Sequence, residues 1–176
     1  VFTGNVDLGS NLLVGNAGST GIAISSAGEV NMAAQPAVLA YNSSDDASAT
    51  GDNTHAAIDF DTEVFDQNSD FASDTFTAPV TGRYMTDVAV TLLDVTDAST
   101  VLECKLLASN RETRIYYFLG LPDGSGTTWG LAGGILIDMD AGDTLTVTAR
   151  VNGMSKVVDI GAGAGPTTYI SVILVA

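Results

Sequence analysis

Apolar and polar residues alternate with a period of two along most of this chain from residue 37 onward. In the segment 83–94, for example, Tyr84, Val88 and Leu92 fall on one face. Such alternation predicts half-buried strands, and no stretch has the period of an amphipathic helix. The pattern therefore predicts an all-β sandwich or barrel. Strands are expected at 37–41, 55–65, 83–94, 100–108, 113–119, 129–139, 144–152, 155–160 and 169–175.

The most specific local pattern lies between Phe76 and Tyr84. Pro79 lacks an amide donor and fixes φ, so it suits the end of a strand rather than a central ladder. Gly82 is expected to supply a turn before the next strand begins. The segment therefore predicts a corner that joins two strands of the sandwich.

Polar segments separate the predicted strands. Residues 42–54 and 66–74 are rich in Asp, Ser and Asn and are expected to be surface loops. The pair Gly133–Gly134 lies inside a predicted strand, where it indicates either a β-bulge or a close approach of neighbouring backbone.

Residues 1–34 have a different composition, rich in Gly, Ser, Asn and Ala. Apolar residues recur there in pairs at alternate positions, which predicts very short strands with one apolar face. One chain cannot bury such faces, so several chains wound together, or a flexible tether, are the two interpretations. We expect a stem over residues 1–35 and a globular head over 36–176. The pairs are Val6 and Leu8, Leu12 and Val14, Ile22 and Ile24, and Val30 and Met32.

The composition excludes several classes of function. The net charge is −15 with only six Lys and Arg residues, which argues against nucleic-acid binding and against adhesion to anionic membranes. No apolar run is long enough for a membrane span. The single cysteine, Cys104, lies in a strand-like segment and is expected to be a buried structural thiol. His55 is the only histidine and is expected at the surface or a strand edge.

Acidic residues gather in several predicted loops and turns. Asp138, Asp140 and Asp143 form the most compact group, because Asp138 and Asp140 share one face of a strand next to a turn. Calcium prefers six to eight oxygen ligands, so this group is a candidate calcium site. The alternative is a set of ordinary solvated carboxylates, and no other cofactor and no catalytic residue is expected.

From Pro36 to its end the chain resembles the C1q-like domain of the C1q and tumour-necrosis-factor superfamily. The residues that carry the resemblance are the opening segment Pro36–Ala40, the corner segment Thr75–Tyr84, the segment Leu136–Val147 with its Gly-Asp pair, and the closing segment 168–174. The resemblance implies an all-β, ten-stranded jelly-roll sandwich that assembles as a homotrimer and serves recognition rather than catalysis.

The aromatic residues offer candidates for a trimer interface. Tyr116, Tyr117, Phe118 and Trp129 provide more aromatic surface than one inner face of a sheet requires. Because successive strand residues point to opposite faces, either Tyr117 or the pair Tyr116 and Phe118 should point outward. An outward aromatic side chain suits a subunit interface.

Secreted animal members of this superfamily carry a collagen stalk, whereas this chain begins with a stem that resembles β-stems of bacteriophage fibres. The resemblance implies a bacteriophage fibre, head-spike or decoration protein on the virion surface. Its stem would contact other virion proteins, and its tip would bind a host-surface glycan or protein. The alternatives are a secreted or cell-surface bacterial adhesion module and, from another class, a glycan-cleaving enzyme.

Overall fold

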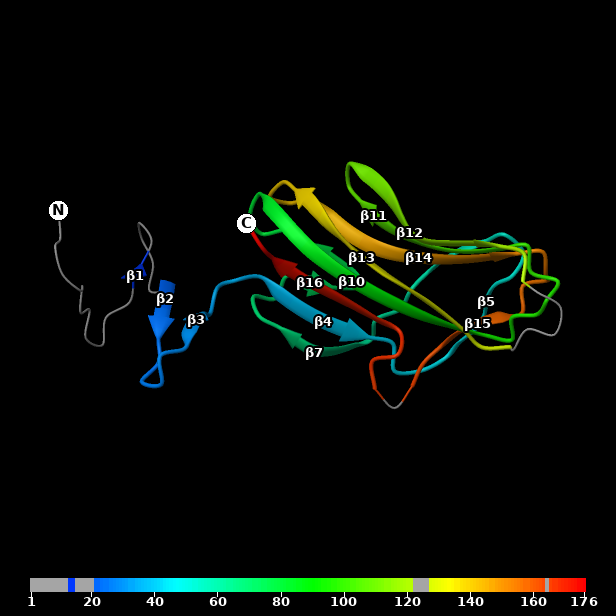
Figure 1. The fold of residues 1–176 in the computed structure, drawn as a ribbon, viewed down its shortest axis with the longest axis horizontal. Coiled ribbons are helices and arrows are strands. Elements are labelled where there is room, and N and C mark those ends of the chain that lie inside the picture. The colour runs from blue at the N-terminus through cyan, green and yellow to red at the C-terminus, as the bar shows by residue number, and fades with distance from the viewer. Residues whose placement is uncertain (1–12, 15–20, 122–126, 164) are drawn as a thin grey trace. The chain divides into compact units, whose positions relative to one another are not determined.

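The structure is a computed structural model that describes residues 13–14, 21–121, 127–163 and 165–176. The chain divides into two compact units, Val1–Gln35 and Pro36–Ala176. The larger unit is a sandwich of two antiparallel sheets, drawn in Figure 1 from cyan to red.

Within the described residues, the first sheet has seven strands and is built around the long strand β10 (Gly82–Leu93). One edge of β10 pairs along almost its whole length with β13, and its other edge pairs with β16 and then with β15. β16 pairs with β4, β4 with β7, and β15 with β5. The bounds are β4 Ala37–Tyr41, β5 Asp46–Thr50, β7 Thr62–Asp66, β13 Trp129–Met139, β15 Val158–Gly161 and β16 Tyr169–Leu174.

The second sheet has six strands in the described part of the chain, in the order β12-β11-β14-β9-β8, with β6 also paired to β14. The strands β12 and β13 are the edge strands of the two sheets, and they contact each other across the sandwich. The bounds are β6 His55–Ala57, β8 Phe71–Ala72, β9 Thr75–Thr77, β11 Val101–Ala108, β12 Arg111–Leu119 and β14 Thr144–Asn152.

The all-β prediction is confirmed, and β4, β13 and β14 have the predicted bounds. Two segments predicted as loops contain strands, because β5 lies within 42–54 and β8 within 66–74. The predicted extended segment 55–65 consists of two strands, β6 and β7, which belong to different sheets. The sheets therefore contain more strands than the ten that were expected.

The core lies between the sheets and takes one face from each. In β10 the buried residues alternate with outward ones, and in β14 the same holds for Leu145, Val147, Ala149 and Val151. Cys104 is fully buried in this core, as predicted, and burial raises the pKa of its thiol to about 12. A thiol with this pKa stays protonated and unreactive at neutral pH.

The corner between β9 and β10 is held by one aromatic side chain. Tyr84 is fully buried, its ring meets the ring of Phe76 edge-on at 5.4 Å, and its hydroxyl donates a hydrogen bond to the Val80 carbonyl at 2.6 Å. The hydroxyl thus fixes the turn that precedes its own strand. Gly82 is the first residue of β10, where a side chain would collide with Leu174 and with the Ala176 carbonyl.

The Gly133–Gly134 pair reflects close packing rather than a bulge, since β13 stays in register with β10 throughout. A Cβ at Gly133 would lie 2.8 Å from the Ile115 carbonyl oxygen, and one at Gly134 would overlap the Thr86 carbonyl oxygen. Both contacts involve backbone atoms, which move less readily than the end of a side chain.

The smaller unit contains the antiparallel strands β1 (Leu13–Val14), β2 (Gly21–Ile24) and β3 (Val30–Met32). Three of the predicted apolar residues, Val6, Leu8 and Leu12, lie outside the described residues, as does part of the predicted loop at 120–126. In the described part of the chain, no helix has the length and hydropathy required to cross a bilayer.

Alanine substitutions at two glycines of β13 test this packing. We expect Gly134→Ala to lower the free energy of unfolding by about 1–3 kcal/mol, because the added methyl group overpacks the contact with β10. Gly130→Ala is the matched control in the same strand, since a Cβ there meets no atom within 4 Å. Chemical denaturation of both variants at one protein concentration checks the prediction, and equal stabilities would contradict it.

Candidate functional site

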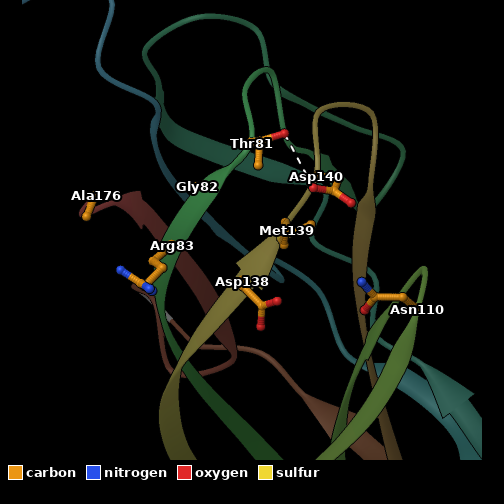
Figure 2. Close-up of a pocket in the computed structure, with 8 residues that line it drawn as sticks. All are labelled: Thr81, Gly82, Arg83, Asn110, Asp138, Met139, Asp140 and Ala176. Atoms are coloured by element: carbon orange, nitrogen blue, oxygen red, sulfur yellow. Dashed lines mark hydrogen bonds between the residues drawn. The ribbon is translucent and has the colours of Figure 1, made fainter.

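The predicted acidic group lies at one end of the sandwich, where the turn after β13 meets the β9–β10 corner. The two turns are joined by backbone hydrogen bonds: Ala78 N–H donates to the Asp143 carbonyl and Gly142 N–H to the Ala78 carbonyl, both at 2.8 Å. A cavity of about 240 Å³ opens beside them, and Figure 2 draws the residues that line it. Its lining residues are Thr81, Gly82, Arg83, Asn110, Asp138, Met139, Asp140 and Ala176.

The three carboxylates have separate structural partners. Asp138 accepts two hydrogen bonds from Arg111, at 2.6 and 3.0 Å, and these bonds lower the pKa of its carboxyl group. Asp140 accepts a long hydrogen bond from the Thr81 hydroxyl at 3.4 Å. The Asp143 carboxylate accepts a hydrogen bond from the Asp140 amide at 3.0 Å, and this bond closes the turn.

Such an arrangement does not favour the expected calcium site. Across the described residues, no three His, Cys, Asp or Glu side chains are grouped so that they could hold a metal ion. The Arg111 guanidinium group pairs with the Asp138 carboxylate and takes the position at which a metal ion would bind. The calcium site at Asp138, Asp140 and Asp143 stays a prediction. The lowered pKa of Asp138 also makes it a poor general acid, the role that glycan cleavage would require.

The four aromatic candidates occupy three different environments. Tyr116 packs against the core, whereas Tyr117 is 41% exposed on the outer face of the second sheet, where the Arg114 guanidinium lies 4.1 Å from its ring centroid. Phe118 is 36% exposed, and its ring lies 6.0 Å from that of Trp129. This pair joins the edge strands β12 and β13. The assignment of all four residues to a trimer interface stays a prediction.

A charged cluster that the sequence analysis did not identify lies on the outer face of the second sheet. We call it the Glu103 cluster, and its members are Glu103, Lys105, Arg114, Arg150 and His55. The cluster holds three of the chain's six Lys and Arg residues and its only histidine. Glu103 is an outward residue of β11, yet its side chain is only 1% exposed because the cations cover it.

The geometry of the cluster follows from strand register. Glu103 lies opposite Arg150 of β14, which in turn lies opposite His55 of β6. Arg114 of β12 reaches Glu103 from the next row, and its Nε donates to Oε1 at 2.6 Å. The Arg150 Nη2 atom lies 2.8 Å from Oε2, an ion-pair contact without hydrogen-bond geometry.

Two further nitrogen atoms lie 4.0 Å from the Glu103 carboxylate, the Lys105 Nζ and the His55 Nε2. Partial burial, together with the charges of Lys105 and Arg150, lowers the pKa of His55. At neutral pH His55 is therefore uncharged, and the cluster carries three positive charges around one buried negative charge.

A small cavity of about 210 Å³ lies beside the cluster and is lined by His55, Lys105, Leu107, Glu112 and Thr148. Glu112 is 67% exposed and accepts a hydrogen bond from the Lys105 Nζ at 3.1 Å. The Thr148 Oγ1 atom is buried and makes no hydrogen bond to any described residue. The cavity therefore combines a partly exposed cation, an unpaired hydroxyl group and an apolar side chain.

Comparisons with known proteins bear on the fold. No protein-family model matches the chain, and no curated protein sequence matches it. Solved structures do match. The globular domain of zebrafish complement 1qA protein aligns over 80% of this chain and 98% of its own, with a TM-score of 0.53 and 18% identity. Murine APRIL at pH 8.5 aligns over 80% and 99%, with a TM-score of 0.53 and 12% identity. The sandwich has the C1q/TNF-like fold.

The contribution of the buried Glu103 carboxylate to stability can be tested by a substitution that removes its charge and keeps its shape. We expect Glu103→Gln to lower the free energy of unfolding by about 1–3 kcal/mol, because it removes the shared counter-ion of Arg114, Arg150 and Lys105, whose side chains are 19–50% exposed. Glu112→Gln removes an exposed partner of Lys105 and should cost about 0–1 kcal/mol. Denaturant titration of both variants measures the difference, and a stable Glu103→Gln protein would refute the central role of this carboxylate.

Proposed function

We propose that this protein is a trimeric, non-enzymatic attachment protein on the surface of a bacteriophage particle. It would be a fibre, head-spike or decoration protein whose head binds a host-surface glycan or protein. The observation that carries the proposal is a C1q/TNF-like sandwich with two apolar surfaces that the described residues leave uncovered. Domains with this fold are usually binding modules, and they typically form trimers.

The first apolar surface is the outer face of the first sheet. Ala37, Ile173, Met85 and Leu136 are cross-strand neighbours in one row over four strands. Three of these side chains are 45–46% exposed. Phe65, which lies opposite Leu39 in the next row of the same face, is 48% exposed at the β7 edge. Such a row on an open sheet face is typical of a surface that another subunit covers.

The second apolar surface is the edge formed by β12 and β13. It exposes Phe118 at 36%, Leu119 at 65% and Ile135 at 38%, and the Phe118 ring lies 6.0 Å from that of Trp129. The two surfaces differ in composition and share only the strand β13, which contributes Leu136 to the first and Ile135 to the second. We infer that the edge of one copy packs on the sheet face of the next, a head-to-tail contact that closes into a ring when repeated.

The smaller unit supports several chains in the stem. Ile22 lies opposite Met32, and Ile24 opposite Val30, so these four side chains share one face of the β2–β3 pair. All four are 39–67% exposed within one chain. Equivalent faces from three copies would bury one another, and the stem would then join the head to other virion proteins.

The proposed ring contact can be tested by one charge on the sheet face. We expect Ile173→Glu to convert the trimer into monomers, because a carboxylate would be buried without a partner at the interface. Val157→Glu is the matched control, since Val157 is 47% exposed and belongs to neither apolar surface. Light scattering coupled to size-exclusion chromatography gives the mass of each protein. A monomeric wild-type protein, or equal masses for both variants, would count against the contact.

The attachment function can be tested by locating the protein. We expect an antiserum raised against the purified chain to label virus particles in a density gradient of the source material, seen by immunogold electron microscopy. Labelled protein should also bind saturably to one bacterial host. Label confined to cell envelopes would instead support a bacterial adhesion module and would refute the virion assignment.

A further inference from the structure

The Glu103 cluster and its cavity have a chemistry that the trimer contacts do not use. The two apolar surfaces lie on the outer face of the first sheet and on the β12–β13 edge, whereas the cavity lies on the outer face of the second sheet. From the geometry we propose that this cavity binds the anionic group of a carboxylated or sulfated sugar. The inference rests on the proposed attachment function and names the class of its ligand.

The local charge of the Glu103 cluster favours an anionic ligand. The chain carries 21 acidic residues against six Lys and Arg, so cations placed at random would be isolated among carboxylates. Instead, Lys105, Arg114 and Arg150 surround one buried carboxylate. Counting Glu112 as the second acid, the site keeps one net positive charge with His55 neutral. Such a local excess attracts an anion to a protein that is otherwise strongly negative.

The hydrogen-bond donors that face the cavity also favour an anionic ligand. The Arg114 Nε donates to Glu103 and the Arg150 Nη2 lies against it, and neither of these residues lines the cavity. Lys105 differs, because its nearest partner is the exposed Glu112 at 3.1 Å, and an ammonium group has three donors. His55 stands beside it with 39% of its side chain exposed. The Lys105 ammonium, with the His55 ring next to it, is thus placed to contact an oxyanion in the cavity.

The other walls favour a sugar over an inorganic anion. The unpaired Thr148 hydroxyl and the exposed Glu112 carboxylate can form hydrogen bonds with sugar hydroxyl groups, and Leu107 offers an apolar contact for a ring face. The cavity of about 210 Å³ is smaller than the roughly 300–1,000 Å³ of drug-sized sites, so it fits one sugar unit. The Arg114–Tyr117 pair lies on β12, the strand that also carries Glu112, and a neighbouring sugar unit could pack there on the exposed aromatic ring.

The single histidine gives a direct readout of binding. The ring protons of His55 can be followed by NMR while the trimer is titrated with glucuronic acid, N-acetylneuraminic acid, galactose 6-sulfate or neutral galactose. We expect saturable shifts of the His55 signals with at least one anionic sugar and none with galactose. The carboxylated and sulfated probes show which anionic group the cavity accepts. Absence of shifts with every anionic sugar, or equal shifts with galactose, would overturn the proposal.

Matched charge variants separate the site from general electrostatics. We expect Lys105→Gln to weaken the binding by about tenfold, the loss of one hydrogen bond to a charged group. Lys156→Gln removes the same charge outside the cluster and should leave the affinity unchanged within about twofold. If Lys105→Gln does not fold, Thr148→Val serves as the second variant, with tryptophan fluorescence monitoring its fold. Equal losses in Lys105→Gln and Lys156→Gln, or full affinity in a folded site variant, would overturn the proposal.

Binding to host cells and binding to sugars, measured on the same protein, distinguish failure of the cavity proposal from failure of the attachment proposal. Wild-type protein that binds host cells without binding any anionic sugar would refute the cavity assignment and leave the attachment function in place. Protein that binds an anionic sugar at this cavity but is missing from virus particles would refute the virion assignment and leave the cavity in place.

Discussion

The central constraint of this molecule is that β10 must be hydrogen-bonded along both edges. β13 occupies one edge from Gly82 to Leu92, and β16 and β15 share the other. Close backbone approach at Gly134 and at Gly82 makes this double pairing sterically feasible. The Tyr84 side chain then ties the start of the strand to the preceding corner. Every other strand of the first sheet is positioned directly or indirectly by β10.

The parts of the fold that were predictable from sequence are those in which burial alternates strictly. In β14, for example, every second residue is buried, and the predicted bounds are correct. β5 could not be predicted, because Asp46–Thr50 contains no large apolar residue. It is held instead by pairing with the distant strand β15 and by a hydrogen bond from the Ser48 amide to Asp159. Contacts of this kind depend on tertiary structure.

The candidate site was harder to predict than the fold. Asp138, Asp140 and Asp143 are near neighbours in sequence, and this proximity made them conspicuous, yet Asp138 is paired with Arg111 of another strand. The partners of Glu103 come from β6, β11, β12 and β14, so only the register of four strands brings them together. One signal was present in the sequence: Glu103 and Lys105 share the outward face of an otherwise apolar strand, Val101–Ala108.

The outer face of the first sheet carries an apolar row, whereas the outer face of the second sheet carries the Glu103 cluster. In the proposed trimer, a ring that closes through the first sheet would turn the charged faces of its three copies away from the common axis, in three different directions. A flat surface that lies alongside such a ring would face one of the three cavities at a time. A long flexible polysaccharide could pass around the head and occupy several, and each added contact would slow its release. The orientation of one sheet face would thus select for ligands that are chains rather than surfaces.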